Sequence, residues 1–344
     1  MHTVAPSVAP GIAASSALTR VAVAGATGYT GQELLRLLAR HPAVSLISAM
    51  SSGATGATRR LPGLTRLWDG AITPLAPATL AEADVVFLAL PDSAAAELAP
   101  TLVDAGVRVV DLSGAFRLRN AIERARWYPE TRRLPDGVAY GLTELERDAV
   151  AGARLVANPG CYPTATLLAL SPLIGAGLLL PNADIIVDAK SGVSGAGKTP
   201  SERTHFSEIH GSMAAYGVFH HRHGAEIEQG AGRQVTFTPH LVPIDRGLLS
   251  TIYVRVAPGA SEDAIGDVLA AAYAGATFVR LVGSALPEIK HVAHTNFCDI
   301  GWRVDPSGRV VLVSVIDNLL KGASGQAVQN LNVMLGLDER TALL

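Results

Sequence analysis

The 344-residue chain is poor in cysteine, in aromatic residues and in charge. Its two cysteines form neither a disulfide framework nor a C-x-x-C pair, which favours a reducing compartment and leaves each thiol to be judged singly. Lysine and arginine total 28 against 30 acidic residues, so the net charge is -2. Because no global positive field exists to attract nucleic acid or anionic lipid, we expect no nucleic-acid partner.

The chain also lacks an apolar run long enough to cross a bilayer, which needs roughly 20 residues. The most apolar stretch, 167–180, is interrupted by Ser171, Pro172 and two glycines. Residues 1–19 have neither the basic start nor the compact apolar segment of a secretory signal, so we expect a flexible tail there. These absences predict a cytoplasmic protein with no membrane partner.

Apolar residues are abundant, at 49% of the chain with a mean hydropathy of +0.29. A chain of this length is expected to form two domains, because domains usually run roughly 100–200 residues. In the first part, short β-branched runs alternate with helical patterns, which predicts a doubly wound parallel sheet. The expected strands are 20–24, 44–49, 85–90 and 107–112, and the expected helices are 32–40 and 93–105.

After residue 128 the pattern changes to longer strands in which apolar and polar residues alternate. This alternation is typical of a mixed or antiparallel sheet with one open face. The expected strands are 185–189, 235–239, 249–256 and 309–315. We therefore place a nucleotide-binding α/β domain at 20–158 and a second domain at 159–317, with the helical segment 318–344 packing back on the first domain.

Three glycines form a G-x-x-G-x-x-G pattern between the first expected strand and helix. In this setting the first glycine permits a tight turn, the second lets the backbone approach a pyrophosphate, and the third allows close packing of helix and strand. Free N–H groups at the helix start can then bind the anion. A glycine turn without a ligand is the alternative. The predicted cofactor contacts are Gly25, Thr27, Gly28, Tyr29, Thr30 and Gly31.

The end of the second expected strand indicates which dinucleotide binds. NAD enzymes usually place an acidic residue there, on the ribose 2′-hydroxyl, but residues 48–52 contain none. Ser51 and Ser52, with Arg59 or Arg60 nearby, can instead accept a 2′-phosphate. The sequence therefore favours NADP.

Cys161 follows a Pro-Gly turn and precedes an Ala/Leu-rich helical segment in which Pro163 suits the first turn. The dipole at a helix N-terminus favours a thiolate, and free N–H groups there can stabilise an oxyanion. Cys161 is therefore the candidate nucleophile, although a lone cysteine is often a small buried hydrophobe. Cys298 has no such setting, and we expect it to be structural.

Several segments together resemble the N-acetyl-gamma-glutamyl-phosphate reductases, a family within the semialdehyde dehydrogenases. The signature around Cys161, residues 156–172, carries the resemblance most specifically, and the likeness covers almost the whole chain after the tail. The other matching segments are the glycine turn, 111–118 (DLSGAFRL), 139–145 (AYGLTEL), 191–198 (SGVSGAGK), 221–223 (HRH) and 317–323 (DNLLKGA).

The resemblance implies a Rossmann domain followed by an α+β catalytic and oligomerisation domain, assembled as a homotetramer. It implies NADPH-dependent reduction of N-acetyl-glutamyl 5-phosphate, a small acyl phosphate, to the 5-semialdehyde through a cysteine thioester in arginine biosynthesis. His221 is the implied acid/base. The residues in matched motifs that could bind the substrate's carboxylate and phosphate are Arg117, Lys198 and Arg222. Asn318 is placed either to contact the nicotinamide carboxamide or to cap a helix.

Three positions depart from the family pattern. Ala115 replaces the usual aspartate and leaves Arg117 without a neighbouring acid, Ala225 replaces the usual proline, and an arginine near the end of the second strand is absent. The last departure leaves the ligand of the 2′-phosphate open. The histidines of 220–223 have no additional Cys or carboxylate at ligand spacing, so we expect no metal.

Other functions share parts of this pattern. Aspartate-semialdehyde dehydrogenases use the same cysteine chemistry, but residues 241–248 lack the Arg and His of their R-V-P-V-x-x-G-H element. Short-chain dehydrogenases need Tyr-x-x-x-Lys, which is absent. An aminoadipyl-phosphate reductase of lysine biosynthesis stays open, because one methylene is worth only about 1–3 kcal/mol of discrimination. The non-enzymatic alternative is a NADP-sensing regulator. The presence of Cys161 and His221 argues against it, because a regulator would not need these catalytic groups.

Overall fold

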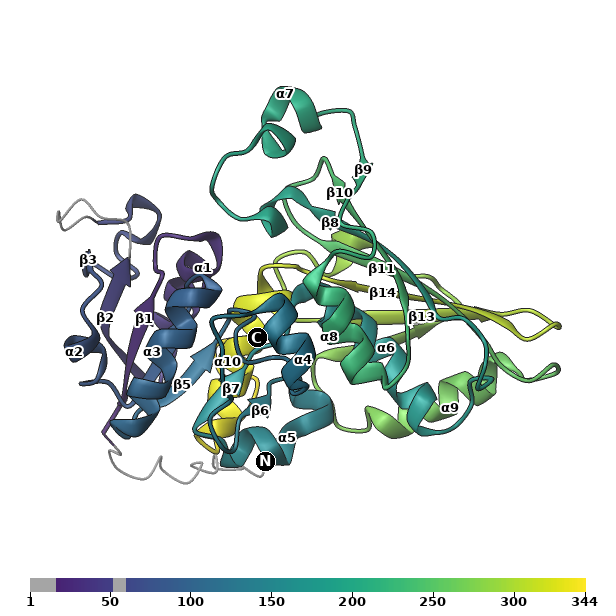
Figure 1. Cartoon of the computed structure of the whole chain (residues 1–344), viewed down its shortest axis with the longest axis horizontal. Coiled ribbons are helices and arrows are strands. Elements are labelled where there is room, and N and C mark those ends of the chain that lie inside the picture. Colours follow the sequence, from purple (N-terminus) through teal and green to yellow (C-terminus); the bar gives the residue numbers. More distant parts are fainter. Residues whose placement is uncertain (1–16, 52–59) are drawn as a thin grey trace, which may run out of the picture.

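The computed structural model, described for residues 17–51 and 60–344, contains two seven-stranded sheets that lie side by side (Figure 1). Residues 1–16 of the expected tail, and Ser52 and Arg59 of the expected 2′-phosphate site, lie outside the described residues. Within the described part, no helix combines the length and the apolar character needed to cross a membrane.

The first sheet is parallel throughout and has the order β3-β2-β1-β4-β5-β7-β6. Its strands are β1 (Thr19–Ala24), β2 (Val44–Ser51), β3 (Ile72–Pro74), β4 (Val85–Leu88), β5 (Arg108–Asp111), β6 (Ala139–Tyr140) and β7 (Leu155–Ala157). The helices in this part are α1 (Tyr29–Leu38), α2 (Pro77–Leu80), α3 (Asp92–Asp104), α4 (Ala121–Trp127) and α5 (Thr143–Gly152). The predicted doubly wound parallel sheet is confirmed.

The second sheet is mixed, with the order β12-β13-β14-β11-β8-β10-β9. Its strands are β8 (Ile186–Gly192), β9 (Ala214–Ala215), β10 (Thr236–Val242), β11 (Leu248–Arg255), β12 (Val279–Gly283), β13 (Cys298–Val304) and β14 (Arg309–Ile316). The helices are α6 (Cys161–Gly175), α7 (Phe206–Ile209), α8 (Arg222–Ala231) and α9 (Glu262–Ala272). Figure 1 shows α6, α8 and α9 along one face of this sheet, and the predicted mixed-sheet domain is confirmed.

Single 3-10 turns complete this description at Pro62–Leu64, Val193–Ala196, Glu202–Thr204 and Ile289–His291. Sequence periodicity missed β3, β6, β7 and β9 because strands of two or three residues are too short to show alternation. It also missed β12 and β13; in β13 five consecutive residues are buried and no alternation exists.

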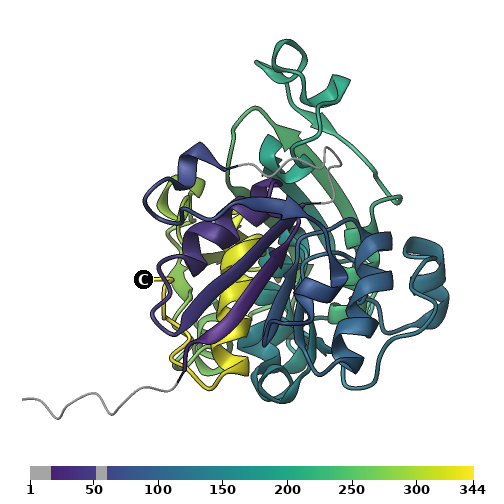
Figure 2. The same ribbon diagram turned by 90° about the vertical axis from the view of Figure 1, so that its left-hand side faces the viewer.

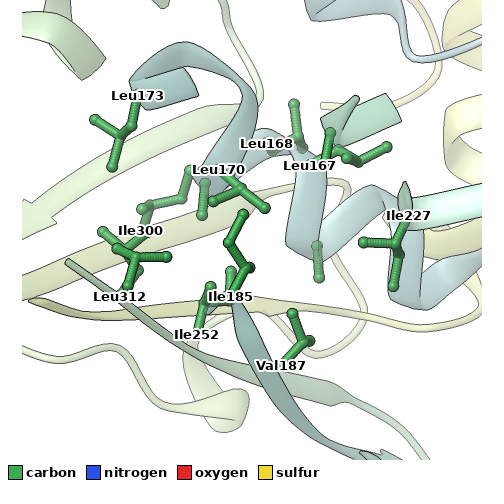
Figure 3. Close-up of a cluster of buried hydrophobic side chains, with 14 of the residues drawn as sticks. Leu167, Leu168, Leu170, Leu173, Ile185, Val187, Ile227, Ile252, Ile300 and Leu312 are labelled. Atoms are coloured by element: carbon green, nitrogen blue, oxygen red, sulfur yellow. The ribbon is translucent and has the colours of Figure 1, made fainter. Parts of the chain in front are cut away.

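Helix α6 forms the centre of the second core. Every residue from 162 to 170 is buried, as expected for a helix that is apolar on all sides. Figure 3 shows its leucines against side chains from the sheet and from α8. The labelled residues are Leu167, Leu168, Leu170, Leu173, Ile185, Val187, Ile227, Ile252, Ile300 and Leu312. This packing fixes the position of Cys161, the first residue of the helix.

The chain returns to the first sheet at its C-terminal end. A π-turn at Leu320–Ser324 leads into α10 (Gly325–Met334), all of whose residues are buried. Ala327, Val328 and Leu331 belong to the same apolar cluster as Val21 of β1 and Leu34 of α1. Figure 2 shows α10, in yellow, running beside the strands of the first sheet. The core of the first sheet therefore depends on residues that follow the second sheet in sequence.

Candidate active site

A cavity of about 770 Å³ opens where the two sheets meet. Its wall on the side of the first sheet consists of the glycine turn, the end of β2 and segments 112–114 and 158–161. Segment 194–200, the start of α8 and segment 318–323 line the other side. The cavity lies beyond the carboxyl ends of β1 and β4, where the strand order reverses, which is the usual place for a ligand in such sheets.

The glycine turn is shaped as a nucleotide-binding turn requires. Gly25 has φ +89°, and a Cβ there would lie 2.0 Å from the carbonyl oxygen of Ala89. A Cβ at Gly31 would lie 2.2 Å from the oxygen of Gly25, so only glycine permits this contact between helix and turn. Helix α1 begins after Gly28, and its N-terminus opens on the cavity.

Five of the six residues predicted from the glycine turn line the cavity, namely Gly25, Thr27, Gly28, Tyr29 and Thr30. The sixth, Gly31, is buried and serves the packing just described. Ser51 also lines the cavity, with its hydroxyl 3.0 Å from the hydroxyl of Thr27. The wall next to β2 thus presents hydroxyls and carries no acidic side chain among its described residues.

Cys161 is the first residue of α6 and lines the same cavity. Burial raises the pKa of its thiol to about 11, outweighing the N–H of Tyr162 and the charge of Arg117, which act in the opposite direction. Desolvation thus opposes the thiolate that the dipole of this helix N-terminus favours. Cys298 lies buried on β13, 3.3 Å from the hydroxyl of Ser314, and burial raises its pKa to about 12.

A buried carboxylate, Glu226 on α8, holds the turn before Cys161. Its Oε1 accepts hydrogen bonds from the backbone N–H of Gly160 at 2.9 Å and from the hydroxyl of Tyr140 at 2.7 Å. Its Oε2 lies 3.3 Å from Nη1 of Arg117. The expectation that Arg117 has no acidic partner is wrong, since Glu226 supplies the acid from a distant helix.

The three predicted cationic residues all line the cavity but differ in their contacts. Arg117 is buried and also donates to the backbone oxygens of Asn158 and Leu112, at 2.8 and 2.9 Å. Arg222 is half exposed and pairs with Asp92. Lys198 is exposed and donates to the backbone oxygen of Thr27 at 3.3 Å, across the cavity. Lys198 and Arg222 thus have more freedom to meet a ligand than Arg117.

The two histidines of the H-R-H segment have rings whose centroids lie 4.8 Å apart, but they make different contacts. The Nδ1 of His221 accepts a hydrogen bond from the backbone N–H of His223 at 3.1 Å and so caps α8. The imidazole ring of His221 packs edge-on against the rings of Tyr162, Tyr216 and Phe237. His223 lines the cavity, whereas His221 is absent from the described lining. Burial lowers the pKa of His221 to about 4 and that of His223 well below its ordinary value.

His223 lies against the turn that carries the cysteine. A Cβ placed on Gly160 would be 2.4 Å from Nε2 of His223 and 2.9 Å from Nη1 of Arg117. The Nδ1 of His223 is buried and has no hydrogen-bond partner among the described residues. His220, the third histidine, is exposed. The structure therefore brings together Cys161, Arg117 and His223, with His221 behind them.

Asn318 lines the cavity between β14 and the π-turn. Its Oδ1 accepts the N–H of Gly247 at 2.7 Å, and its Nδ2 donates to the hydroxyl of Ser194 at 2.9 Å. The neighbouring Asp317, not Asn318, accepts the N–H groups of Leu319 and Leu320, so the alternative of a helix-capping Asn318 is wrong.

Sequence reasoning missed Glu226 and Gly322. A Cβ on Gly322 would lie 2.7 Å from the Cβ of Cys161, so the π-turn closes on the cysteine only because this residue is glycine. Glu226 was detectable, because it follows His223 by three residues and therefore shares its face of α8. Nothing in the local pattern indicated Gly322. Within the described residues, no group of three His, Cys, Asp or Glu side chains could hold a metal ion.

Comparisons with known proteins agree with this architecture. Residues 20–153 match the family model described as semialdehyde dehydrogenase, NAD binding domain, and residues 161–318 match that described as semialdehyde dehydrogenase, dimerisation domain. The crystal structure of aspartate semialdehyde dehydrogenase II from Vibrio cholerae superposes with a TM-score of 0.71 at 20% identity, over 93% of this chain and 99% of that one. At that identity the likeness shows the fold alone. The fold and its cysteine-lined cavity define a member of the semialdehyde dehydrogenase class.

Sequence relatives define the member more closely. N-acetyl-gamma-glutamyl-phosphate reductase from Desulforapulum autotrophicum is 45% identical over 339 residues, and the one from Geotalea daltonii is 47% identical over 341. Each match covers 95% of this chain and 98% of the relative. The chain belongs to the N-acetyl-gamma-glutamyl-phosphate reductase family of oxidoreductases, and the family predicted from sequence is confirmed.

Alkylation of the unliganded protein should reveal the raised pKa of Cys161. Because the thiolate is the reactive form, the rate with iodoacetamide should rise about tenfold per pH unit from pH 7 to 9 without levelling off. The measurement is the mass of the modified peptide against time at each pH. Cys298 should stay unmodified as the buried control. A rate that levels off below pH 8 would show a thiolate and contradict this assignment.

Proposed function

We propose that the protein reduces N-acetyl-L-glutamyl 5-phosphate to N-acetyl-L-glutamate 5-semialdehyde with NADPH, through a thioester on Cys161. The observation that carries the proposal is the position of Cys161, at the start of a buried helix and facing the cavity lined by the glycine turn. The relatives named as N-acetyl-gamma-glutamyl-phosphate reductases support the substrate over the longer aminoadipyl phosphate. The role is a step of arginine biosynthesis.

In this mechanism the sulfur of Cys161 attacks the acyl carbon and inorganic phosphate leaves. Bound NADPH supplies the hydride that reduces the thioester carbonyl. The resulting hemithioacetal releases the aldehyde when its hydroxyl loses a proton and the thiol regains one. We assign the stabilisation of the oxyanion at both stages to the N–H groups at the start of α6.

The remaining residues of the cavity have roles that follow from their contacts. We assign Lys198 and Arg222 to the anionic groups of the substrate, because both cations line the cavity. Arg117, whose donors are already used by Glu226 and two backbone oxygens, is assigned to the support of the turn at 158–161 and to its electrostatics. We assign Asn318 to the part of the cavity that binds the cofactor. Its side-chain amide donates to Ser194, which also lines the cavity.

The match of residues 161–318 to a dimerisation domain supports a homo-oligomer, and we propose the tetramer that the family resemblance implies. We also propose a cytoplasmic location, as predicted from the sequence.

Replacing Cys161 tests the chemistry directly. The acyl phosphate is labile, so the assay runs in reverse and follows the phosphate-dependent reduction of NADP by N-acetyl-glutamate semialdehyde. We expect Cys161→Ser to lose essentially all turnover while retaining NADPH affinity, because a serine hydroxyl at neutral pH is far less nucleophilic than a cysteine thiol. Cys298→Ser is the matched control and should keep the wild-type rate. A Cys161→Ser enzyme with near-wild-type turnover would refute the mechanism.

The hydroxyl-lined, acid-free wall at β2 generates a prediction about the cofactor. Wild type should show a higher kcat/KM with NADPH than with NADH. Ser51→Asp should lower kcat/KM for NADPH by about tenfold or more and affect NADH less, because the carboxylate repels the 2′-phosphate. Ser51→Ala, which removes the hydroxyl without adding charge, is the control. Equal use of both cofactors by wild type, or an unchanged NADPH preference in Ser51→Asp, would contradict the proposal.

The histidines require a comparison, since the family resemblance selects His221 and the cavity geometry favours His223. We expect His223→Asn to lower kcat by about 10²–10⁴-fold, the usual contribution of a positioned imidazole, with little change in NADPH affinity. His221→Asn should have a smaller effect, exerted through the cap that holds the N–H of His223. His220→Asn is the exposed control. A larger loss at His221 would return the acid/base role to that residue.

A further inference from the structure

The carboxylate of Glu226 bonds to three segments near Cys161: the turn before it, the end of β6 and the segment after β5. It lies on α8, it accepts the N–H of the residue that precedes the cysteine, and it binds the tyrosine that ends β6. It also pairs with Arg117, which follows β5. The side chain of Glu226 is 1% exposed, so these contacts are made without competing water.

Such a group is costly to bury, because a desolvated carboxylate needs both a countercharge and hydrogen bonds. Glu226 has both, and no oxygen of it is left without a partner. The arrangement leaves the turn at Gly160 beside a neutral pair instead of an isolated guanidinium. A Cβ at Gly160 would be 2.9 Å from Nη1 of Arg117, which shows how closely that cation approaches the residue before the nucleophile.

We propose that Glu226 is a positioning residue that fixes the Pro159–Gly160 peptide and balances the charge of Arg117 next to the sulfur. The inference rests on the proposed nucleophilic role of Cys161. Glu226 contacts no reacting atom and acts through Arg117 and the turn. Its function is to keep the thiol protonated until substrate and imidazole are in place, so that the open cavity does not expose a permanent thiolate.

The two charges act on the thiol in opposite directions. After desolvation, Arg117 lowers the pKa of Cys161, and Glu226 raises it. The titratable and charged groups described around the cysteine include Arg117, Arg222, Lys198, Asp92, Glu226, His221, His223, Tyr29, Tyr162 and Tyr216. Among these charged groups, only Arg117 and Glu226 are buried and bonded to the segment that leads into Cys161.

The test measures alkylation of Cys161 by iodoacetamide at pH 7.5 in the unliganded full-length protein. Glu226→Gln should raise the rate about threefold. A fall of one unit in pKa raises the thiolate fraction about tenfold, but the weaker base is also a weaker nucleophile. Arg117→Met should lower the rate by about the same factor, and the double variant Arg117→Met/Glu226→Gln should return to within twofold of wild type.

Two controls separate this role from simple support of the fold. Tyr140→Phe removes a hydrogen bond from Oε1 without removing charge, and its alkylation rate should stay within twofold of wild type. Modification of Cys298, which is buried, reports any opening of the structure. If Glu226 were only structural, both single variants would react faster at Cys161 and Cys298 together, and that result would overturn the proposal.

Opposite changes in the two single variants support the proposal, and unchanged rates in both overturn it. Where one single variant does not fold, the other carries the test, because the predicted directions are opposite. Glu226→Asp keeps the charge and should restore a rate within twofold of wild type. Turnover of Cys161→Ser decides the proposed mechanism independently, since alkylation needs no substrate or cofactor.

Discussion

The burial of α6 is the constraint on which the rest of the structure depends. Its residues from 162 to 170 are all inside the second core, so the helix cannot shift without opening that core. Its first residue, Cys161, nevertheless has to reach the cavity beside the nucleotide-binding turn. The chain meets both demands by entering α6 directly from β7 of the first sheet, through only three residues, 158–160.

That short crossing is held from both sides. The backbone N–H of Asn158 donates to Asp111 at the end of β5, and its side chain donates to the oxygen of Ala323 in the π-turn. Asn330 of α10 donates to the side-chain oxygen of Asn158 at 3.0 Å. Gly160 is held in turn by Glu226. Cys161, the proposed nucleophile, is therefore positioned by hydrogen bonds from both domains, as preorganised catalysis would require.

The C-terminal segment gives the site its second layer of support. Lys321 is wholly buried, and its ammonium donates to Glu144 at 2.6 Å and to Gln329 at 2.7 Å. Although burial opposes it, this ammonium holds the pKa of Glu144 below its ordinary value. Breaking such a pair leaves an uncompensated buried charge, so the pair favours one arrangement of the π-turn over others. In that arrangement Gly322 closes against Cys161.

The sequence alone determined the features that local physics controls. Strands β1, β2, β4 and β5 of the parallel sheet follow from periodicity, the glycine turn with its helix follows from glycine spacing, and the start of α6 at Cys161 follows from the Pro-Gly turn. Tertiary structure decided what depends on distant residues. It gave Arg117 an acid from α8, raised the pKa of the Cys161 thiol through desolvation, and faced His223 instead of His221 toward the cavity. Burial and long-range ion pairs depend on which surfaces meet, and that information is not contained in any local pattern.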